Sequence, residues 1–163
     1  MTCYRASGND IEVLSGVLHD SVFDPDAASL DESAKRFRLP VKRLDHAART
    51  RRRFLFLPYW EVPLRQCELQ VTGVVRRERG LDRSMLADGE RSTFDLLLRL
   101  RPRAGGLRLE TSFGAILLDC STAPVVEVVD GDLTSEVGAR DFGKGVVDAV
   151  GLAKELERLR VRD

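Results

Sequence analysis

The residues of this sequence best suited to bind a charged ligand are the basic side chains between positions 35 and 53. Residues 33–53 hold nine bases and one acid, Asp45. Aromatic residues follow between positions 54 and 60, and aromatic rings interleaved with cations stack on nucleobases in proteins that bind single strands. The candidate ligand- or partner-binding residues are Arg36, Arg38, Lys42, Arg49, Arg51, Arg52, Arg53, Tyr59 and Trp60.

The charge balance of the whole chain argues against a nucleic-acid partner. Lysine and arginine total 26, and aspartate and glutamate also total 26, whereas nucleic-acid-binding domains are usually strongly basic. Residues 1–32 hold seven acids and one base, and residues 119–141 hold six acids and one base. We therefore expect segment 35–53 to pair with the chain's own acids or with an acidic protein. Binding of nucleic acid or a phosphorylated ligand is the alternative.

The two histidines of the chain do not predict a metal site. His19 precedes Asp20, a pair also found in metal-dependent phosphohydrolases, but such a site requires further ligands from neighbouring helices. The second histidine, His46, stands beside Asp45 in a different context. We predict that no metal is bound and that His19 lies at a helix end, where it interacts with the helix dipole.

The sequence contains no recognisable motif for a nucleophile or a phosphate-binding loop. Neither GxSxG nor GxxxxGK[ST] occurs. We interpret Gly143-Lys144-Gly145 as a flexible entry to the last helix rather than an anion site. The three cysteines are widely spaced and odd in number, which argues against a disulfide framework and a cysteine zinc site. We predict no catalytic residue and no cofactor, and a hydrolase with an unrecognised site is a further alternative.

The elements that must position these residues follow from hydrophobic periodicity. Helical spacing predicts a helix near 10–20 and a second helix from about 146 onward, and the arginines near the chain end suit the C-terminus of the latter. Residues 76–90 are charged and are predicted to form a loop. Alternation of apolar and polar residues predicts strands over 34–44, 64–75, 93–101, 107–113, 115–120 and 125–129, with Pro40 at an edge or bulge and a hairpin turn at Ala104-Gly105-Gly106.

Consecutive strands with short connections favour antiparallel pairing. We predict an α+β fold: a mainly antiparallel sheet of five or six strands with an N-terminal and a C-terminal helix, in a single domain over 1–163. The side chains expected on the sheet face that the helices cover are Phe37, Leu39, Val41, Cys67, Leu69, Val71, Phe94, Leu96, Leu98, Leu109 and Val128.

Location and assembly follow from the same patterns. No apolar run approaches ~18 residues and no signal peptide precedes the first helix, so we expect a cytoplasmic protein without a membrane partner. The aromatic segment Phe54–Trp60 is broken by Pro58. An apolar segment of this kind, in a chain of zero net charge, predicts a homodimer that uses this segment or a strand edge.

The opening of the chain resembles small bacterial α+β families, some of which are toxin-immunity proteins. The resemblance rests on a short helix that runs into Leu18-His19-Asp20 and then on alternating strands, and covers about the first fifth of the chain. It implies binding to a protein partner and no catalytic residues. The leading hypothesis is therefore a non-enzymatic protein-interaction protein.

Overall fold

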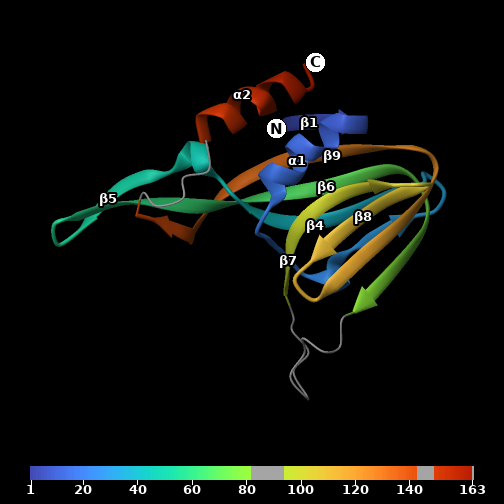
Figure 1. Ribbon diagram of the computed structural model, residues 1–163, viewed down its shortest axis with the longest axis horizontal. Helices are drawn as coiled ribbons and strands as arrows, with labels where there is room; N and C mark the ends of the chain where they lie inside the picture. Colours follow the sequence, from blue (N-terminus) through green and yellow to red (C-terminus); the bar gives the residue numbers. More distant parts are fainter. Residues whose placement is uncertain (82–93, 143–148, 163) are drawn as a thin grey trace.

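The computed structural model describes residues 1–81, 94–142 and 149–162. Within these ranges the chain forms nine strands, two α-helices and three short 3-10 helices. The strands are β1 (Thr2–Ser7), β2 (Ser21–Phe23), β3 (Ser29–Asp31), β4 (Arg36–Leu44), β5 (Thr50–Phe54), β6 (Leu57–Leu81), β7 (Asp95–Arg103), β8 (Gly106–Thr111) and β9 (Gly114–Asp141). The helices are α1 (Ile11–Leu18) and α2 (Ala149–Leu159), and both lie beside β1 (Figure 1).

Six of the strands close into an antiparallel barrel. Hydrogen-bonded neighbours follow the order β9-β8-β7-β2-β4-β6, and β6 pairs back with β9. Closure depends on the length of β6 and β9, because each strand changes partner along its course. The first part of β9 pairs with β8 and its later part with β1, while both parts pair with β6. A closed ring leaves fewer unpaired edges than an open sheet.

The core lies inside this barrel and under α1. Alternate residues of each barrel strand point inward, as the period of a strand requires. The amide of Leu100 in β7 donates a hydrogen bond of 2.8 Å to the Ser15 hydroxyl in α1. This bond fixes the helix against the barrel. The fully buried core side chains include Ile11, Leu14, Leu18, Phe37, Leu39, Leu69, Val71, Leu97, Leu107, Leu109, Leu118, Val126 and Val128.

The prediction of an α+β fold with a sheet of five or six strands is wrong. The described chain is dominated by nine strands that form one sheet, most of which closes on itself, and the two helices are short. The sequence alternation missed β1, β2, β3 and β5, and the start of the predicted loop at 76–90 is in fact the end of β6. Charged residues continue this strand because residues 75–80 are all exposed to solvent.

Two prolines occupy positions where a strand has no partner for the missing N–H. Pro40 lies inside β4, between the part that pairs with β3 and the part that pairs with β2. Pro124 lies inside β9, between the parts that pair with β8 and with β1. Because no ladder hydrogen bond is required there, neither proline breaks the strand. The two strands predicted on either side of Pro124 are therefore the single strand β9.

The predicted β7–β8 hairpin is confirmed, but its inward set is partly wrong. A register shift lies between Leu97 and Arg99, so Leu97 and Leu100 are buried. Phe94 and Leu96 are exposed instead, and Leu98 is only half-buried. A single irregular residue in a strand moves the side chains beyond it to the opposite face of the sheet. The other predicted inward residues are buried.

A three-stranded arm projects from the barrel (Figure 1). It consists of β5, the first residues of β6 and the last residues of β9, with Arg51 opposite Trp60 and Trp60 opposite Asp141. The segment Phe54–Trp60, which Pro58 was expected to interrupt, is the tip and one side of this arm. The arm continues the barrel strands β6 and β9, so its orientation follows from the barrel itself.

The two predicted helices are confirmed as α1 and α2. The chain that follows α2 reaches the free edge of β1, where the amide of Val161 donates a hydrogen bond of 2.8 Å to the Cys3 carbonyl. The tripeptide Gly143-Lys144-Gly145 lies outside the described residues, and so do residues 82–90 of the predicted loop. Among the described helices, none is long and apolar enough to cross a membrane.

Candidate functional site

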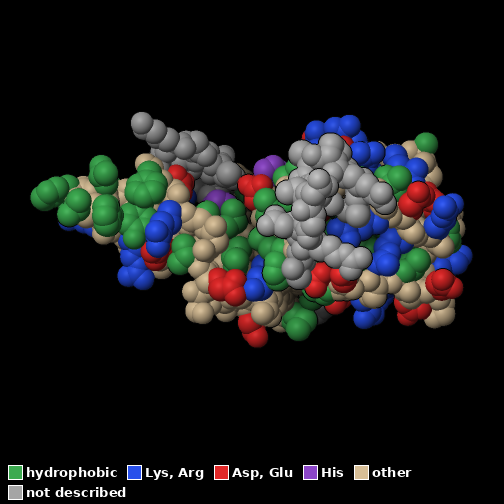
Figure 2. Space-filling view, turned by 90° about the horizontal axis from the view of Figure 1, so that it is seen from below, with side chains coloured by type: hydrophobic (Ala, Val, Ile, Leu, Met, Phe, Trp, Pro, Cys, Tyr) green, Lys and Arg blue, Asp and Glu red, His purple; other side chains and the backbone are tan. Residues whose placement is uncertain are grey.

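The tip of the arm exposes four consecutive apolar side chains. Phe54 is 65% exposed, Leu55 79%, Phe56 95% and Leu57 64%. Figure 2 shows these side chains as a hydrophobic end of the elongated molecule, with basic side chains next to it. Single exposed apolar residues are ordinary, but a contiguous exposed group at the end of a projection is typical of an interaction surface.

The turn at the tip does not have the sequence that its geometry favours. Phe54 pairs with Leu57, so Leu55 and Phe56 form a two-residue hairpin loop. Such loops prefer asparagine and glycine because they require positive φ angles, yet Leu55 adopts a φ of 56°. A left-handed conformation costs a side chain like that of leucine roughly 1–2 kcal/mol. Local folding therefore does not account for the apolar residues at this turn.

Most of the predicted basic and aromatic binding residues lie on the same arm. Arg51, Arg52 and Arg53 lie on the exposed strand β5. Arg52 forms an ion pair of 3.1 Å with Glu61, whereas the side chains of Arg51 and Arg53 form no ion pair within the described chain. Two arginines next to the apolar tip are thus available to an acidic partner.

The aromatic residues behind the tip have partners within the arm. The guanidinium of Arg49 lies 4.6 Å from the centre of the Trp60 ring, in a cation–π contact. The Tyr59 ring stacks on Phe142 at 5.3 Å, and its hydroxyl donates a hydrogen bond to Glu61. These contacts stiffen the arm. They also engage Tyr59 and Trp60 with other residues of the arm, so neither ring is left free to stack on a nucleobase.

The remaining predicted basic residues lie elsewhere. Arg36, Arg38 and Lys42 belong to β4 in the barrel, on the strand face that does not contribute to the core. Lys42 forms an ion pair of 2.8 Å with Glu136 of β9. The structure therefore divides the basic segment into a barrel set and an arm set.

An apolar groove crosses the outer face of the barrel near the base of the arm. It has a volume of about 820 Å³, which lies within the range of sites that hold drug-sized molecules. Its apolar lining comes from side chains of several strands, including Val22, Pro40, Leu64 and Val129, and it carries the carboxylates of Asp24, Glu68 and Glu136. No local sequence signal indicates this groove, because its residues come from strands that are distant in sequence.

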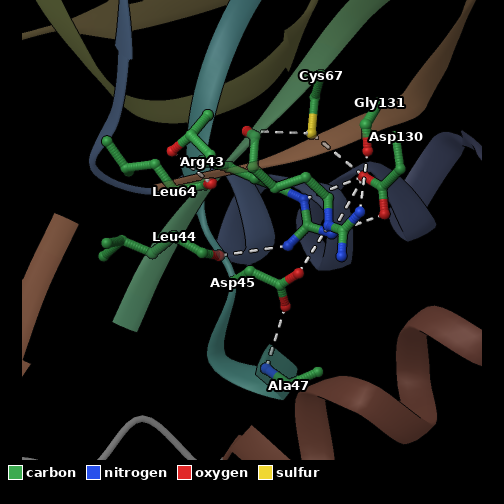
Figure 3. Close-up of polar contacts among 10 residues, drawn as sticks. Arg43, Leu44, Asp45, Ala47, Leu64, Cys67, Asp130 and Gly131 are labelled. Carbon is green, nitrogen blue, oxygen red and sulfur yellow. Dashed lines mark hydrogen bonds and ion pairs between the residues drawn. The ribbon is translucent and has the colours of Figure 1, made fainter. Parts of the chain in front are cut away.

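A buried polar cluster lies at the boundary of the core, on the side where the arm begins (Figure 3). Arg43 donates hydrogen bonds of 2.8, 3.0 and 3.2 Å to the Asp130 carboxylate, and the Cys67 thiol donates to the same carboxylate at 3.2 Å. Arg65 binds Asp45 at 2.6 Å and the Gly131 carbonyl at 2.9 Å. Because both arginines already bind carboxylates, we interpret this cluster as the link between barrel and arm.

The pKa values of groups in the cluster, and of His46 next to Asp45 in the chain, are shifted. Burial alone would raise the pKa of Asp45, but the hydrogen bond from Arg65 and the charges of Arg43 and Arg65 outweigh it, and the pKa of Asp45 is lowered. Burial lowers the pKa of His46, and the nearby charge of Arg49 acts in the same direction. Burial raises the pKa of the Cys67 thiol to about 12. At neutral pH these pKa shifts favour a charged Asp45 and a neutral His46 and Cys67.

We expect Cys67 to be unreactive in the folded protein. With a pKa of about 12 it carries roughly a thousand-fold less thiolate at neutral pH than an ordinary cysteine, and the thiolate is the reactive form. In a Cys3→Ser/Cys120→Ser variant, an aromatic disulfide reagent at pH 7.5 should react with Cys67 at least about a thousand-fold more slowly than in urea. Similar rates in the two conditions would show that the thiol is neither buried nor bound to Asp130.

Neither histidine belongs to a group of potential metal ligands among the described residues. His19 follows the end of α1, and its Nδ1 atom lies 3.1 Å from a carboxylate oxygen of Asp20, with both side chains largely exposed. The described part of the chain holds no group of three or more histidine, cysteine or acidic side chains that could bind a metal ion.

Comparison with known proteins gives no match: no family model fits, and no curated protein or solved structure is significantly similar.

Proposed function

We propose that this chain is a protein-binding module that inserts the tip of its β-arm into an apolar groove of a protein partner. The observation that carries this proposal is the run of four exposed apolar side chains, Phe54 to Leu57, at the end of a projecting arm. The resemblance to toxin-immunity families also implies binding to a protein.

The tip has the composition of an interface anchor. Full burial of one phenylalanine or leucine side chain contributes roughly 1.5–3 kcal/mol, and a few such residues dominate most interfaces. Phe56 has the most to gain, because it is 95% exposed in the free chain. The ion pair and ring contacts at the base of the arm hold the strands in place, so docking orders few additional groups.

The arginines beside the tip favour a partner with acidic residues around its groove. Arg51 and Arg53 have no ion pair within the described chain, and charges at the rim of an interface raise the rate of association more than its strength. We expect replacement of both by alanine to slow association and to reduce its salt dependence. Replacement of Phe56 should mainly accelerate dissociation.

A photo-crosslinking residue at position 56 tests the proposal. In cells that express the chain, we expect a discrete protein adduct at position 56 that disappears when wild-type chain is present in excess, but not when the Phe56→Asp chain is. A crosslinking residue at Val75, an exposed position farther along β6, is the matched control and should give no such adduct.

Three results would contradict the proposal. One is the absence of a protein adduct at position 56, and the second is adducts with lipid alone. The third is binding of random single-stranded RNA at 50 mM salt with an affinity that falls steeply as salt rises, because phosphate contacts would then explain the arginines.

A further inference from the structure

The groove on the outer face of the barrel is complementary to the arm tip: a concave apolar surface is matched by a narrow apolar projection, and the charges around the two are opposite. The groove is lined mainly by apolar side chains and has a volume of about 820 Å³, while the tip presents four apolar side chains on one narrow hairpin. Two surfaces that each expose apolar area in the free chain gain by covering one another. The groove is thus an acceptor of the kind that the tip requires.

The charges around the two surfaces have opposite signs. The groove carries Asp24 and Glu68, which form no ion pair within the described residues. The tip is flanked by Arg51 and Arg53, which are equally unpaired. Because the chain has zero net charge, two copies do not repel one another electrostatically as whole molecules. A second copy of this chain therefore supplies both the apolar and the acidic features that the tip needs.

The position of the groove fits a reciprocal arrangement. Its residues Leu64 and Glu136 belong to the strand segments at the base of the arm. When two copies place their arms antiparallel, each tip lies beside the base of the other arm, where the other groove begins. Such an arrangement is a closed two-fold dimer in which both tips and both grooves are used.

Pairing of the two β5 edges is a less favourable alternative. The strand Thr50–Phe54 has three consecutive arginines, so two such strands side by side would bring like charges together. Charged residues on an edge strand commonly prevent this kind of pairing. The contact between copies is therefore expected at the tip and not along the strand.

We propose that the partner of the arm tip is a second copy of this chain, with each tip seated in the outer barrel groove of the other. This inference rests on the proposed function, since it identifies the groove into which the tip inserts. The interaction joins Phe56 and its apolar neighbours to the groove around Pro40 and Val129, and joins Arg51 or Arg53 to Glu68.

Sedimentation velocity of the purified chain between 1 and 100 µM, about the range of transient to stable dimers, tests the inference. We expect a monomer–dimer equilibrium in the wild type. Phe56→Asp in the tip and Pro40→Asp in the groove should each weaken it at least about thirty-fold, which is the scale of an interface hot spot. Both positions are exposed, so the monomer should remain folded, as circular dichroism can verify. The matched control Val75→Asp should dimerise like the wild type.

Mixing the two variants gives the decisive result. The Phe56→Asp chain keeps an intact groove and the Pro40→Asp chain keeps an intact tip. The mixture should therefore form a heterodimer at concentrations where each variant alone stays monomeric. In the charge-reversed pair, Arg53→Glu should weaken dimerisation, and Glu68→Arg in the same chain should restore most of it.

A wild-type chain that stays monomeric at 100 µM, or a mixture that forms no heterodimer, overturns the inference. The crosslinking experiment at position 56 separates that outcome from failure of the proposed function. An adduct with a different protein and a monomeric wild type would leave the protein-binding role intact and remove the second copy as partner. Lipid adducts alone would contradict both.

Discussion

Replacement of Asp130 by alanine should lower the free energy of unfolding by about 3–5 kcal/mol. The side chains of Arg43 and Asp130 are only 7% and 9% exposed, so the substitution leaves a guanidinium buried without its carboxylate. The thiol of Cys67 loses the nearer of its two acceptors at the same time. Urea unfolding at pH 7, followed by circular dichroism, measures the loss directly.

Two further variants test whether the buried charge is the cause. Replacing both partners, as in Arg43→Met/Asp130→Leu, should recover much of the loss, because the uncompensated charge is removed as well. The pair of Arg5 and Glu127 is the control on the same strand, because the Arg5 side chain is 59% exposed. Glu127→Ala leaves only a solvated guanidinium and should cost less than about 1 kcal/mol. Equal losses for Asp130→Ala and Glu127→Ala would show that the cluster does not support the barrel.

Replacement of Gly106 by alanine should cost about 3 kcal/mol, through overlap with backbone rather than through loss of a contact. A Cβ atom at this position, where β8 begins, would overlap the carbonyl oxygen of Leu118 in the paired strand β9. A backbone carbonyl cannot rotate away as a flexible side chain can, so β8 and β9 must separate locally. The loss is measured by the same urea unfolding experiment.

The neighbouring glycine provides the control. Gly105 has a φ of 72°, but a Cβ atom there would meet nothing within 4 Å. Gly105→Ala should therefore cost only the conformational strain of about 1–2 kcal/mol, and Gly105→Asn less, since asparagine tolerates this conformation. A larger loss for Gly105→Ala than for Gly106→Ala would contradict the close approach of β8 and β9.

Function could be predicted from the sequence only as a class of interaction. Arg51, Arg52, Arg53, Tyr59 and Trp60 were identified as candidate binding residues because a run of cations is followed there by aromatic rings. The same pattern did not indicate whether Phe54 to Leu57 would be core or surface, since an apolar run is equally consistent with both. Burial depends on what the rest of the chain places against the segment, and the described residues leave each of the four side chains at least 64% exposed.

The sequence by itself determined the local elements with a clear period: α1, α2, most of β4, and the β7–β8 hairpin with its glycine turn. In these segments the side-chain pattern repeats over several residues, so the local preference is strong. Gly105 and Gly106 were correctly placed at that turn, but their different roles depend on the distance to β9.

Only the tertiary structure decided how the strands close and what that closure brings together. The long strands β6 and β9 change partners along their length. No local signal encodes a partner as distant in sequence as Asp130 is from Cys67, a separation of 63 residues. The barrel, the groove on its outer face and the cluster of Arg43, Asp130 and Cys67 all arise from such pairings. Non-local contacts form only when the whole chain is arranged, and for that reason the candidate site emerged from the fold and not from a motif.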